Sequence, residues 1–377
     1  MAGRRASRRR KKRPLPDDGT LDMTHSPETA PQESVQAAHS GRLRAGLVGF
    51  GRMGLTHFSI LNTHPRVEFR AICDESAFVR KSIERYVKVE AFSDYARMID
   101  DTGLDFLVVA TPTGAHTEVV ARALQRGVHV FVEKPLALRS EDSRRLVEVA
   151  SERKLVNQVG YVVRFNDVMM QIRRLLEARA IGEMIHYKLE MNGPTVLREP
   201  TSWRGRKAEG GGCLYDFASH SIDLVNYLFD GDPTPRGTVM QRIHSRDAED
   251  AVYTTLLHRS GLRGSLLINW SDPAYRKPSY RLEVLGREGK LIADLHMYKA
   301  FFRSAPPLPE FQAGWNTRYV TDFAEPVRFY LRGYEFTRQL DYFVDCVLGG
   351  RAADMCSFAD GFATDRLMER IVEDALQ

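Results

Sequence analysis

The fold of this chain is decided by residues 43–54, which read Leu43-Arg-Ala-Gly-Leu-Val-Gly-Phe-Gly-Arg-Met-Gly54. Leu47, Val48 and Phe50 form a short apolar run, which predicts a strand buried on both faces. Glycines follow at positions 49, 51 and 54 in the G-x-G-x-x-G spacing, and residues 53–61 have the pattern of a helix. A strand, a glycine-rich turn and a helix in this order predict a dinucleotide site.

The three glycines have separate physical tasks in such a turn. Gly49 permits the tight turn, Gly51 lets the backbone approach a pyrophosphate, and Gly54 allows the helix to pack closely on the strand. The helix N-terminus offers free N–H groups and the positive end of a dipole to the phosphates. The alternative interpretation is a tight turn in an unrelated α/β protein.

The next strand supplies an acidic residue at the position that a dinucleotide site requires. Residues 67–73 predict this strand, and Asp74 follows it, twenty residues past Gly54, where the ribose-binding carboxylate belongs. Asp74 and Glu75 would repel a 2′-phosphate, so NAD is the predicted cofactor and NADP is less favoured. Arg80 or Lys81, one turn further on, leaves NADP as the alternative.

Strands and helices then alternate as far as residue 162. The sequence predicts helices over residues 77–86, 94–100, 117–125 and 140–153, the last capped by Ser140, and strands over 104–110, 128–132 and 156–161. This alternation predicts a doubly wound, mostly parallel sheet.

Beyond residue 162 the pattern changes to runs of strands. After a linking helix over 167–180, strands are predicted over residues 184–191, 237–244, 252–257, 262–270, 280–285 and 290–295, with one helix over 214–228. Residues 297–330 are predicted to be an irregular surface loop, followed by helices over 335–348 and 358–375. The domains are therefore expected to be residues 43–162 and an α+β domain, 163–377, with a large, mostly antiparallel open sheet. The last helices can pack back on the first domain.

A second informative stretch is residues 210–220, Gly-Gly-Gly-Cys-Leu-Tyr-Asp-Phe-Ala-Ser-His. The three glycines let the backbone come close to a ligand at the start of a helix. Asp216 and His220 are spaced i, i+4, so they can form a carboxylate–imidazole pair suited to acid–base work near neutral pH. The alternative is a structural contact on the helix surface.

With these motifs in order, the chain resembles the glucose–fructose oxidoreductase, inositol dehydrogenase and rhizopine-catabolism (Gfo/Idh/MocA) family. The resemblance covers about residues 43–376. It rests on the following motifs: Gly49-Phe50-Gly51-Arg52-Met53-Gly54, Asp74, Thr111-Pro112 with His116, Glu133-Lys134-Pro135, Trp203-Arg204, and Gly210-Gly211-Gly212 with Asp216 and His220.

The resemblance implies an NAD(P)-dependent oxidoreductase that acts on a secondary hydroxyl of a sugar, cyclitol or sugar derivative. By this resemblance Lys134 is the active-site lysine, Asp216 binds substrate and orients the histidine, and His220 is the acid/base. The residues of the first five motifs are expected around the cofactor, a cis peptide is expected at Lys134-Pro135, and no metal is expected.

Three further positions have two interpretations each. His116 is either close to the nicotinamide or structural, and Arg164 either faces the substrate cleft or is an ordinary surface arginine. Trp203-Arg204 either walls the nicotinamide site or places the tryptophan in the core. The nearby Arg206 and Lys207 would suit a phosphorylated or nucleotide-linked sugar, but a solvated charged loop is the favoured interpretation.

Composition limits the remaining possibilities. The formal charge is +5, but residues 4–13 contain eight Lys and Arg and no acidic residue, and without them it is −3. We interpret this run as part of a disordered leader, residues 1–42, with a nucleic-acid arm or a localisation patch as alternatives. Four cysteines without a zinc-type spacing fit a reducing, cytoplasmic setting. No apolar run is long enough to span a membrane.

Two other functions stay open at this stage. One is reduction of a keto-sugar, possibly nucleotide-linked, in biosynthesis, and the other is a catalytically silent, cofactor-sensing regulator on the same fold. Because family members associate through the outer face of the antiparallel sheet, the resemblance also implies a homodimer or homotetramer.

Overall fold

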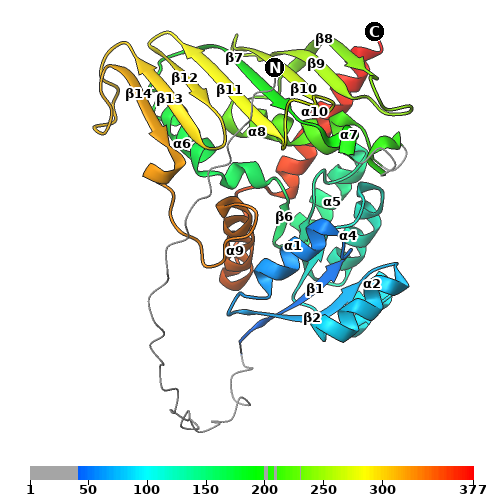
Figure 1. Cartoon of the computed structure of the whole chain (residues 1–377). Coiled ribbons are helices and arrows are strands. Elements are labelled where there is room, and N and C mark those ends of the chain that lie inside the picture. Colours follow the sequence, from blue (N-terminus) through cyan, green and yellow to red (C-terminus); the bar gives the residue numbers. More distant parts are fainter. Residues whose placement is uncertain (1–40, 199–202, 208–209, 230) are drawn as a thin grey trace, which may run out of the picture. The chain divides into compact units, whose positions relative to one another are not determined.

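The computed structural model describes residues 41–198, 203–207, 210–229 and 231–377, and the predicted disorder of residues 1–42 lies almost wholly outside this range. The first half contains a six-stranded, all-parallel sheet with the order β3-β2-β1-β4-β5-β6 (Figure 1). Its strands are β1 (Leu43–Val48), β2 (Val67–Cys73), β3 (Glu90–Phe92), β4 (Phe106–Val109), β5 (His129–Val132) and β6 (Asn157–Val159). The sequence missed β3, a three-residue strand at the sheet edge.

Helices cover both faces of this parallel sheet. Along β4, Leu107 and Val109 pack toward α3 (Tyr95–Asp101), α4 (His116–Gln125) and α5 (Ser140–Glu152). Phe106 and Val108 point the other way, toward α1 (Arg52–Leu61) and α9 (Tyr334–Gly349). The predicted helix over 77–86 is divided into α2 (Ala77–Ser82) and a π-helical turn, η1 (Ile83–Val87). The doubly wound fold is therefore confirmed.

The second half contains an eight-stranded sheet with the order β14-β13-β12-β11-β7-β10-β9-β8. The strands are β7 (Met184–Asn192), β8 (Thr234–Gln241), β9 (Ala251–Leu257), β10 (Arg263–Asn269), β11 (Ser279–Gly286), β12 (Gly289–Ala293), β13 (Met297–Phe302) and β14 (Gly314–Tyr319). Every pairing is antiparallel except that of β7 with β10. A large, mostly antiparallel sheet was predicted, and it is confirmed.

One face of the eight-stranded sheet is covered by α6 (Asp167–Glu177), α8 (Ser219–Leu228) and α10 (Phe358–Ala375) (Figure 1). Side chains such as Tyr187, Leu282 and Phe302 point into the core beneath this face. Side chains at alternate positions, such as Lys188 and Phe301, lie on the opposite face, where Figure 1 shows no helix within the described residues.

The interpretation of residues 297–330 as an irregular loop was wrong. Residues 297–302 form β13, and residues 314–319 form the edge strand β14, whose Trp315 lies opposite Phe301. Pro306, Pro307 and Pro309 interrupt this region and suggested a loop, but they fall in the connection between the two strands. The segment becomes a hairpin because β12 offers β13 a strand to pair with.

Ser140 was predicted to cap α5, and this was also wrong. Ser140 is the first residue of the helix, and the side chain of Arg139, which precedes it, makes no capping hydrogen bond. Its backbone N–H donates to Glu369 at 2.6 Å, and its hydroxyl donates to the same carboxylate. Glu369 lies on α10, so an acceptor from the far end of the chain takes the place of a local cap.

Among the helices of the described residues, none has the length and apolar character needed to cross a membrane. All four cysteines are free and buried.

Candidate active site

The glycine-rich turn after β1 has the geometry that a dinucleotide requires. Gly49 has φ +89°, and a Cβ there would lie 2.7 Å from the carbonyl oxygen of Ala110. A Cβ on Gly54 would lie 1.9 Å from the carbonyl oxygen of Gly49. A Cβ on Gly51 would meet nothing within 4 Å, so the space above the turn is open to a ligand. Gly49 and Gly54 are therefore needed for close packing, and Gly51 leaves room for the approach of a ligand.

The residues around this turn fit a dinucleotide. Gly51, at the N-terminus of α1, has no side chain that could cap the helix, and a helix N-terminus favours an anionic group. The Asp74 carboxylate accepts hydrogen bonds from the N–H of Phe50 at 2.8 Å and of Ser76 at 2.9 Å. Asp74 is thus fixed beside the turn, at the end of β2. The hydroxyl oxygen of Thr111, in the turn after β4, is buried and has no hydrogen-bond partner among the described residues.

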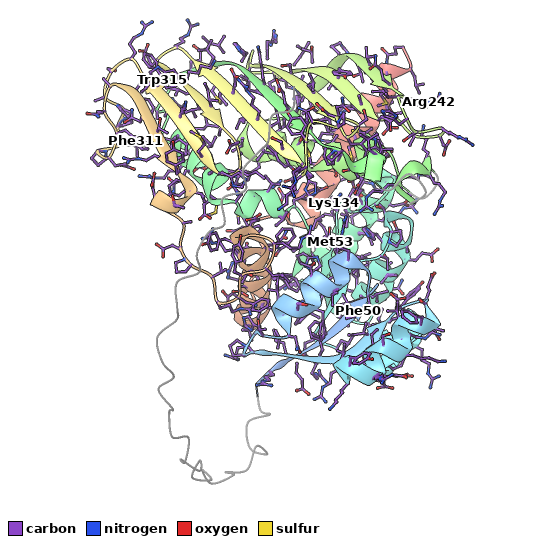
Figure 2. All side chains as sticks on the ribbon, in the orientation of Figure 1. Phe50, Met53, Lys134, Arg242, Phe311 and Trp315 are labelled. Atoms are coloured by element: carbon purple, nitrogen blue, oxygen red, sulfur yellow. The ribbon has the colours of Figure 1, made fainter. Side chains whose placement is uncertain are left out.

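Lys134 directly follows Glu133 at the end of β5, and its side chain contacts Asp216 in the second half of the chain (Figure 2). The Lys134-Pro135 peptide is cis, as the family resemblance implied. The Lys134 ammonium lies 2.8 Å from Oδ1 of Asp216 and also donates to the carbonyl oxygen of Asp216. Only 11% of each side chain is exposed. The ion pair therefore joins the carboxyl end of the parallel sheet to the helix that carries Asp216.

Arg204 takes the second oxygen of the Asp216 carboxylate. Its Nε lies 2.8 Å from Oδ2 of Asp216. Burial raises the pKa of Asp216, but the charges of Lys134 and Arg204 outweigh burial and hold the pKa well below its usual value. Asp216 is ionised at neutral pH. Arg204, which was expected at the cofactor, is bound to Asp216, and the side chain of Trp203 lies outside the described part of the structure.

The predicted hydrogen bond between Asp216 and His220 is absent from the described residues. Residues Cys213–Ala218 form a π-helical turn, η6, before α8 begins. A π-turn has an i→i+5 repeat, so residues spaced i, i+4 no longer stack on one face as they do in an α-helix. The Asp216 carboxylate accepts hydrogen bonds from Lys134 and Arg204. The Nδ1 atom of His220 is buried and has no hydrogen-bond partner among the described residues.

His220 is held in its neutral form. Burial and the nearby Lys134 charge lower its pKa to about 3, against the opposite effects of Glu133 and Asp216. Part of the ring remains accessible. The ring of Tyr161 lies edge-on to it, with the two centroids 6.4 Å apart. A neutral, partly accessible imidazole beside an ammonium group can accept a proton.

The Gly210–Gly212 run approaches protein atoms, which corrects the expectation of a ligand there. The carboxylate of Glu249 accepts a hydrogen bond from the N–H of Leu214 at 2.8 Å. The backbone carbonyl oxygen of Glu249 accepts one from the N–H of Cys213 at 2.9 Å. A Cβ on Gly212 would lie 2.4 Å from Oε1 of Glu249. The start of the helix is therefore bound by Glu249. The sequence gave no sign of this, because nothing local links residue 249 to residue 214.

His116 is fully buried between two loops. Its ring nitrogens lie 2.9 Å from the carbonyl oxygen of Pro135 and 3.0 Å from that of Thr111. Burial lowers the pKa of the ring. The ring offers no surface to a cofactor, which corrects the expectation of a direct contact. His116 instead holds the turn after β4 against the loop that begins at Lys134.

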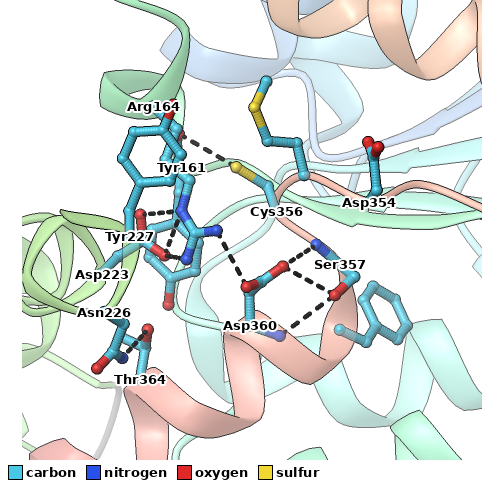
Figure 3. A network of polar contacts seen from close by, with 12 residues as sticks. Tyr161, Arg164, Asp223, Asn226, Tyr227, Asp354, Cys356, Ser357, Asp360 and Thr364 are labelled. Atoms are coloured by element: carbon cyan, nitrogen blue, oxygen red, sulfur yellow. Dashed lines mark hydrogen bonds and ion pairs between the residues drawn. The ribbon is translucent and has the colours of Figure 1, made fainter. Parts of the chain in front are cut away.

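Arg164 lies within a network of polar contacts (Figure 3). It is buried, with 3% of its surface exposed, and its guanidinium makes three hydrogen bonds to Asp223 at 2.6–3.1 Å. A fourth, at 3.0 Å, goes to Asp360. Asp223 lies on α8 and Asp360 on α10, so Arg164 joins these helices. Neither interpretation offered by the sequence, a cleft residue or a surface arginine, was right.

The remaining candidates lie at the edges of the site. Met53 is half-buried and Arg52 exposed at the start of α1 (Figure 2). Arg206 and Lys207 are exposed, and the backbone of Lys207 donates to Asp247 at 2.9 Å. Within the described ranges, no group of three or more His, Cys, Asp or Glu side chains is placed to hold a metal ion.

Two family models match the chain. Residues 43–161 match the model of the "Oxidoreductase family, NAD-binding Rossmann fold", and residues 169–292 match the "GFO/IDH/MocA C-terminal domain". The chain is 27% identical over 306 residues to scyllo-inositol 2-dehydrogenase (NAD(+)) of Bacillus subtilis, a match that covers 76% of this chain and 86% of the relative.

A second relative is levoglucosan dehydrogenase of Pseudarthrobacter phenanthrenivorans, which is 24% identical over 383 residues, with 88% of this chain and 96% of the relative covered. A solved structure of levoglucosan dehydrogenase, in complex with NADH and levoglucosan, superposes with a TM-score of 0.78 at 23% identity. The superposition covers 89% of this chain and 97% of the chain in that structure. The motifs, the two sheets and the family models agree, and the chain belongs to the GFO/IDH/MocA oxidoreductase family, with its NAD-binding Rossmann fold.

Proposed function

We propose that this protein is an NAD-dependent dehydrogenase that oxidises a secondary hydroxyl of a sugar, cyclitol or sugar derivative. The observation that carries the proposal is the 2.8 Å contact between Lys134 and Asp216, beside the neutral imidazole of His220. It brings an ammonium group, a carboxylate and a base together at the carboxyl end of the NAD-binding sheet, where ligands bind in open α/β folds. The names of the sugar and cyclitol dehydrogenases among the relatives support the substrate class.

Each residue of the site has a separate chemical task. A nicotinamide held at this site would supply the hydride acceptor for the carbon that carries the hydroxyl. His220, neutral at pH 7, takes the hydroxyl proton, and the Lys134 ammonium stabilises the negative charge that develops on the oxygen. Asp216 stays ionised, holds the ammonium in place and accepts a hydrogen bond from a further substrate hydroxyl. Arg204 keeps the carboxylate fixed from its other side.

The cofactor would lie along the ends of β1, β2, β4 and β5. Phosphates would approach the backbone at Gly51, and a ribose would meet Asp74. The proposed cofactor contacts are the following: Gly49, Phe50, Gly51, Arg52, Met53, Gly54, Asp74, Thr111, Pro112, Glu133, Lys134 and Trp203.

The same residues would serve the reverse reaction, because the group that accepts the hydroxyl proton during oxidation returns it during reduction. The reduction of a keto-sugar and a silent cofactor sensor remain the competing functions, and the experiment below separates them.

The test is a parallel assay of NADH and NADPH formation by the purified full-length chain, with inositols, hexoses, their phosphates and nucleotide sugars. We expect turnover with NAD, and a loss of at least about 100-fold in kcat for His220→Asn, because general-base catalysis is worth this much. NADH binding, followed by fluorescence, should be kept by the variant.

Each other outcome contradicts the proposal in a different way. Unchanged turnover in His220→Asn would exclude the assigned base. Tight NADH binding without turnover on any alcohol would favour the sensor. Oxidation of NADH by keto-sugars alone would favour the reductase.

We also propose that the protein forms a homodimer or homotetramer through the face of the eight-stranded sheet that α6, α8 and α10 leave uncovered. Mixed polar and apolar side chains on this face, including Tyr253, Leu267 and Phe301, support the proposal. A cytoplasmic location is proposed on the four free, buried cysteines. The division into residues 43–162 and 163–377 is retained as the proposed domain boundary.

A further inference from the structure

A buried hydrogen bond connects the helix of the dinucleotide turn to the residue before Lys134. His57 lies on α1 and Glu133 directly follows β5. The Nε2 atom of His57 is 2.6 Å from Oε1 of Glu133, and the two side chains are 1% and 12% exposed. Neither the sequence patterns nor the proposed mechanism assigned a task to His57.

The other oxygen of the Glu133 carboxylate faces the backbone of Lys134. The N–H of Lys134 lies 3.3 Å from Oε2 of Glu133. A Cβ on Gly160, which follows β6, would lie 3.2 Å from the carboxylate. The carboxylate is therefore enclosed between α1, β6 and the backbone of Lys134, and it has little room to change its rotamer.

The orientation of the His57 ring is also fixed. The ring lies edge-on to Phe131 of β5, with a centroid distance of 5.1 Å and an interplanar angle of 67°. Its Nδ1 atom is buried and has no hydrogen-bond partner in the described structure. The tautomer with its proton on Nε2 therefore suits the site, and this proton points at Glu133.

The His57 contact keeps Glu133 charged. Burial raises the pKa of Glu133, but the hydrogen bond from His57 and the charge of Lys134 lower it below the ordinary value overall. Charged and titratable groups face Glu133 from several elements: His57 of α1, His116 of α4, Lys134 after β5, His220 of α8 and Arg332 before α9. Among these groups, His57 is the one within 2.6 Å of the carboxylate.

We propose that His57 is a positioning residue that keeps Glu133 ionised and in place, so that Glu133 can fix the backbone of Lys134 at the reaction centre. The dinucleotide helix and the active-site lysine are thereby coupled through one buried hydrogen bond. This inference rests on the proposed function for the task of Lys134. The hydrogen bond and its effect on Glu133 can be tested without any turnover.

The test compares His57→Gln, His57→Asn and His57→Leu in the full-length chain. The side-chain amide of Gln can reach the position of Nε2, whereas the amide of Asn reaches only that of Nδ1, and Leu has no donor. We expect His57→Gln to keep kcat within about 3-fold of the wild type. Asn and Leu should lose at least about 10-fold in kcat, because small displacements of a catalytic group are costly.

A second measurement needs neither cofactor nor substrate. Loss of a hydrogen bond to a buried carboxylate should raise the pKa of Glu133. His57→Leu is compared with His57→Gln, because both variants lack a titratable imidazole. A higher pKa of Glu133 in the folded state lowers stability as the pH rises, so the Tm of His57→Leu should fall further below that of His57→Gln as the pH rises from about 4.

The outcomes separate this inference from the proposed function. A Tm difference between His57→Leu and His57→Gln that does not change with pH, or Gln no better than Asn in kcat, would overturn the role of His57, because loss of packing alone predicts both. A wild type without turnover would overturn the proposed function, while the pH dependence of Tm would still decide whether His57 holds Glu133 ionised.

Discussion

Asp365 shows how the environment of a single residue sets its chemistry. This side chain lies on α10 and is 2% exposed. Burial raises its pKa to about 8, although the hydroxyl of Ser143 and the N–H of Ala137, at 3.0 Å, both donate to Oδ2. Its other oxygen is buried without a partner in the described residues. The group is therefore a neutral acid at pH 7.

We expect Asp365→Asn to stabilise the protein increasingly as the pH rises. The folded pKa lies above the unfolded value, so the wild type loses stability between about pH 4 and pH 8, as the unfolded chain gives up a proton that the folded chain keeps. Asn keeps the acceptor oxygen and removes this dependence. Urea unfolding at pH 5.5 and pH 8 should show a gain for Asn that is larger at pH 8 by at least about 1 kcal/mol. An equal gain at both pH values would contradict a neutral Asp365.

At the scale of elements, the segment that carries Asp216 and His220 is held from outside. The π-helical turn η6 begins at Cys213, and Glu249 binds the backbone N–H groups of residues 213 and 214. A carboxylate at a helix N-terminus satisfies free donors and complements the helix dipole. Glu249 is mostly buried, and burial raises its pKa. The connection before β9 therefore helps to place the proposed active-site helix.

We expect Glu249→Ala to lower stability by about 1–2 kcal/mol, which is the usual cost of losing a helix cap. Glu249→Gln keeps the acceptor oxygen for Leu214 and is the matched control. Because η6 carries Asp216, the Ala variant should also raise KM for the sugar substrate, with NADH affinity unchanged. Urea unfolding and steady-state kinetics check this. An Ala variant as stable as Gln would show that Glu249 does not hold the helix.

Arg164 is a second residue that fixes how elements pack. Its buried ion pairs to Asp223 and Asp360 join α8, which carries His220, to α10. A buried arginine with satisfied donors fixes the relation of two helices, and removing one partner would leave an uncompensated charge.

At the scale of the whole molecule, the open face of the eight-stranded sheet is the proposed assembly surface. Val239, Tyr253 and Leu267 lie side by side across β8, β9 and β10 in the pairing register. At the opposite edge, Phe301 and Trp315 pack with their ring centroids 5.4 Å apart, and 57% of Trp315 is exposed. Apolar side chains on an uncovered sheet face mark an interaction surface.

We expect size-exclusion chromatography with light scattering to show a dimer or tetramer for the wild type and a smaller species for Leu267→Arg. The added charge would have to be desolvated in the interface. Ser260→Lys, in the turn before β10, is the control and should leave the assembly unchanged. A wild-type monomer, or a Leu267→Arg protein of unchanged mass, would contradict assembly through this face.

Much of the architecture was predictable from sequence because it depends on local patterns. The bounds of β2 and α10 were predicted to the residue. The reason is that hydrophobic residues recur with a period of 2 in a strand and of 3.6 in a helix, and such a period can be recognised within a short stretch of sequence. The alternation of strands and helices likewise predicted the doubly wound sheet. The family resemblance rested on the glycine spacing and Asp74 together with Glu133-Lys134-Pro135 and the stretch over residues 210–220.

The sequence by itself predicted most of the helices and strands, the half of the chain that carries the dinucleotide turn, and Lys134, Asp216 and His220 as candidate active-site residues. Only the tertiary structure decided which side chains contact one another. It paired residues 297–302 with residues 314–319 as a hairpin, placed Glu369 at the start of α5, bound the Asp216 carboxylate to Lys134 and Arg204, and buried Arg164 between helices. It also placed His57 against Glu133, 76 residues away. The physical reason is that periodicity is local, whereas hydrogen bonds, ion pairs and the pKa values that follow from burial depend on residues brought together by folding.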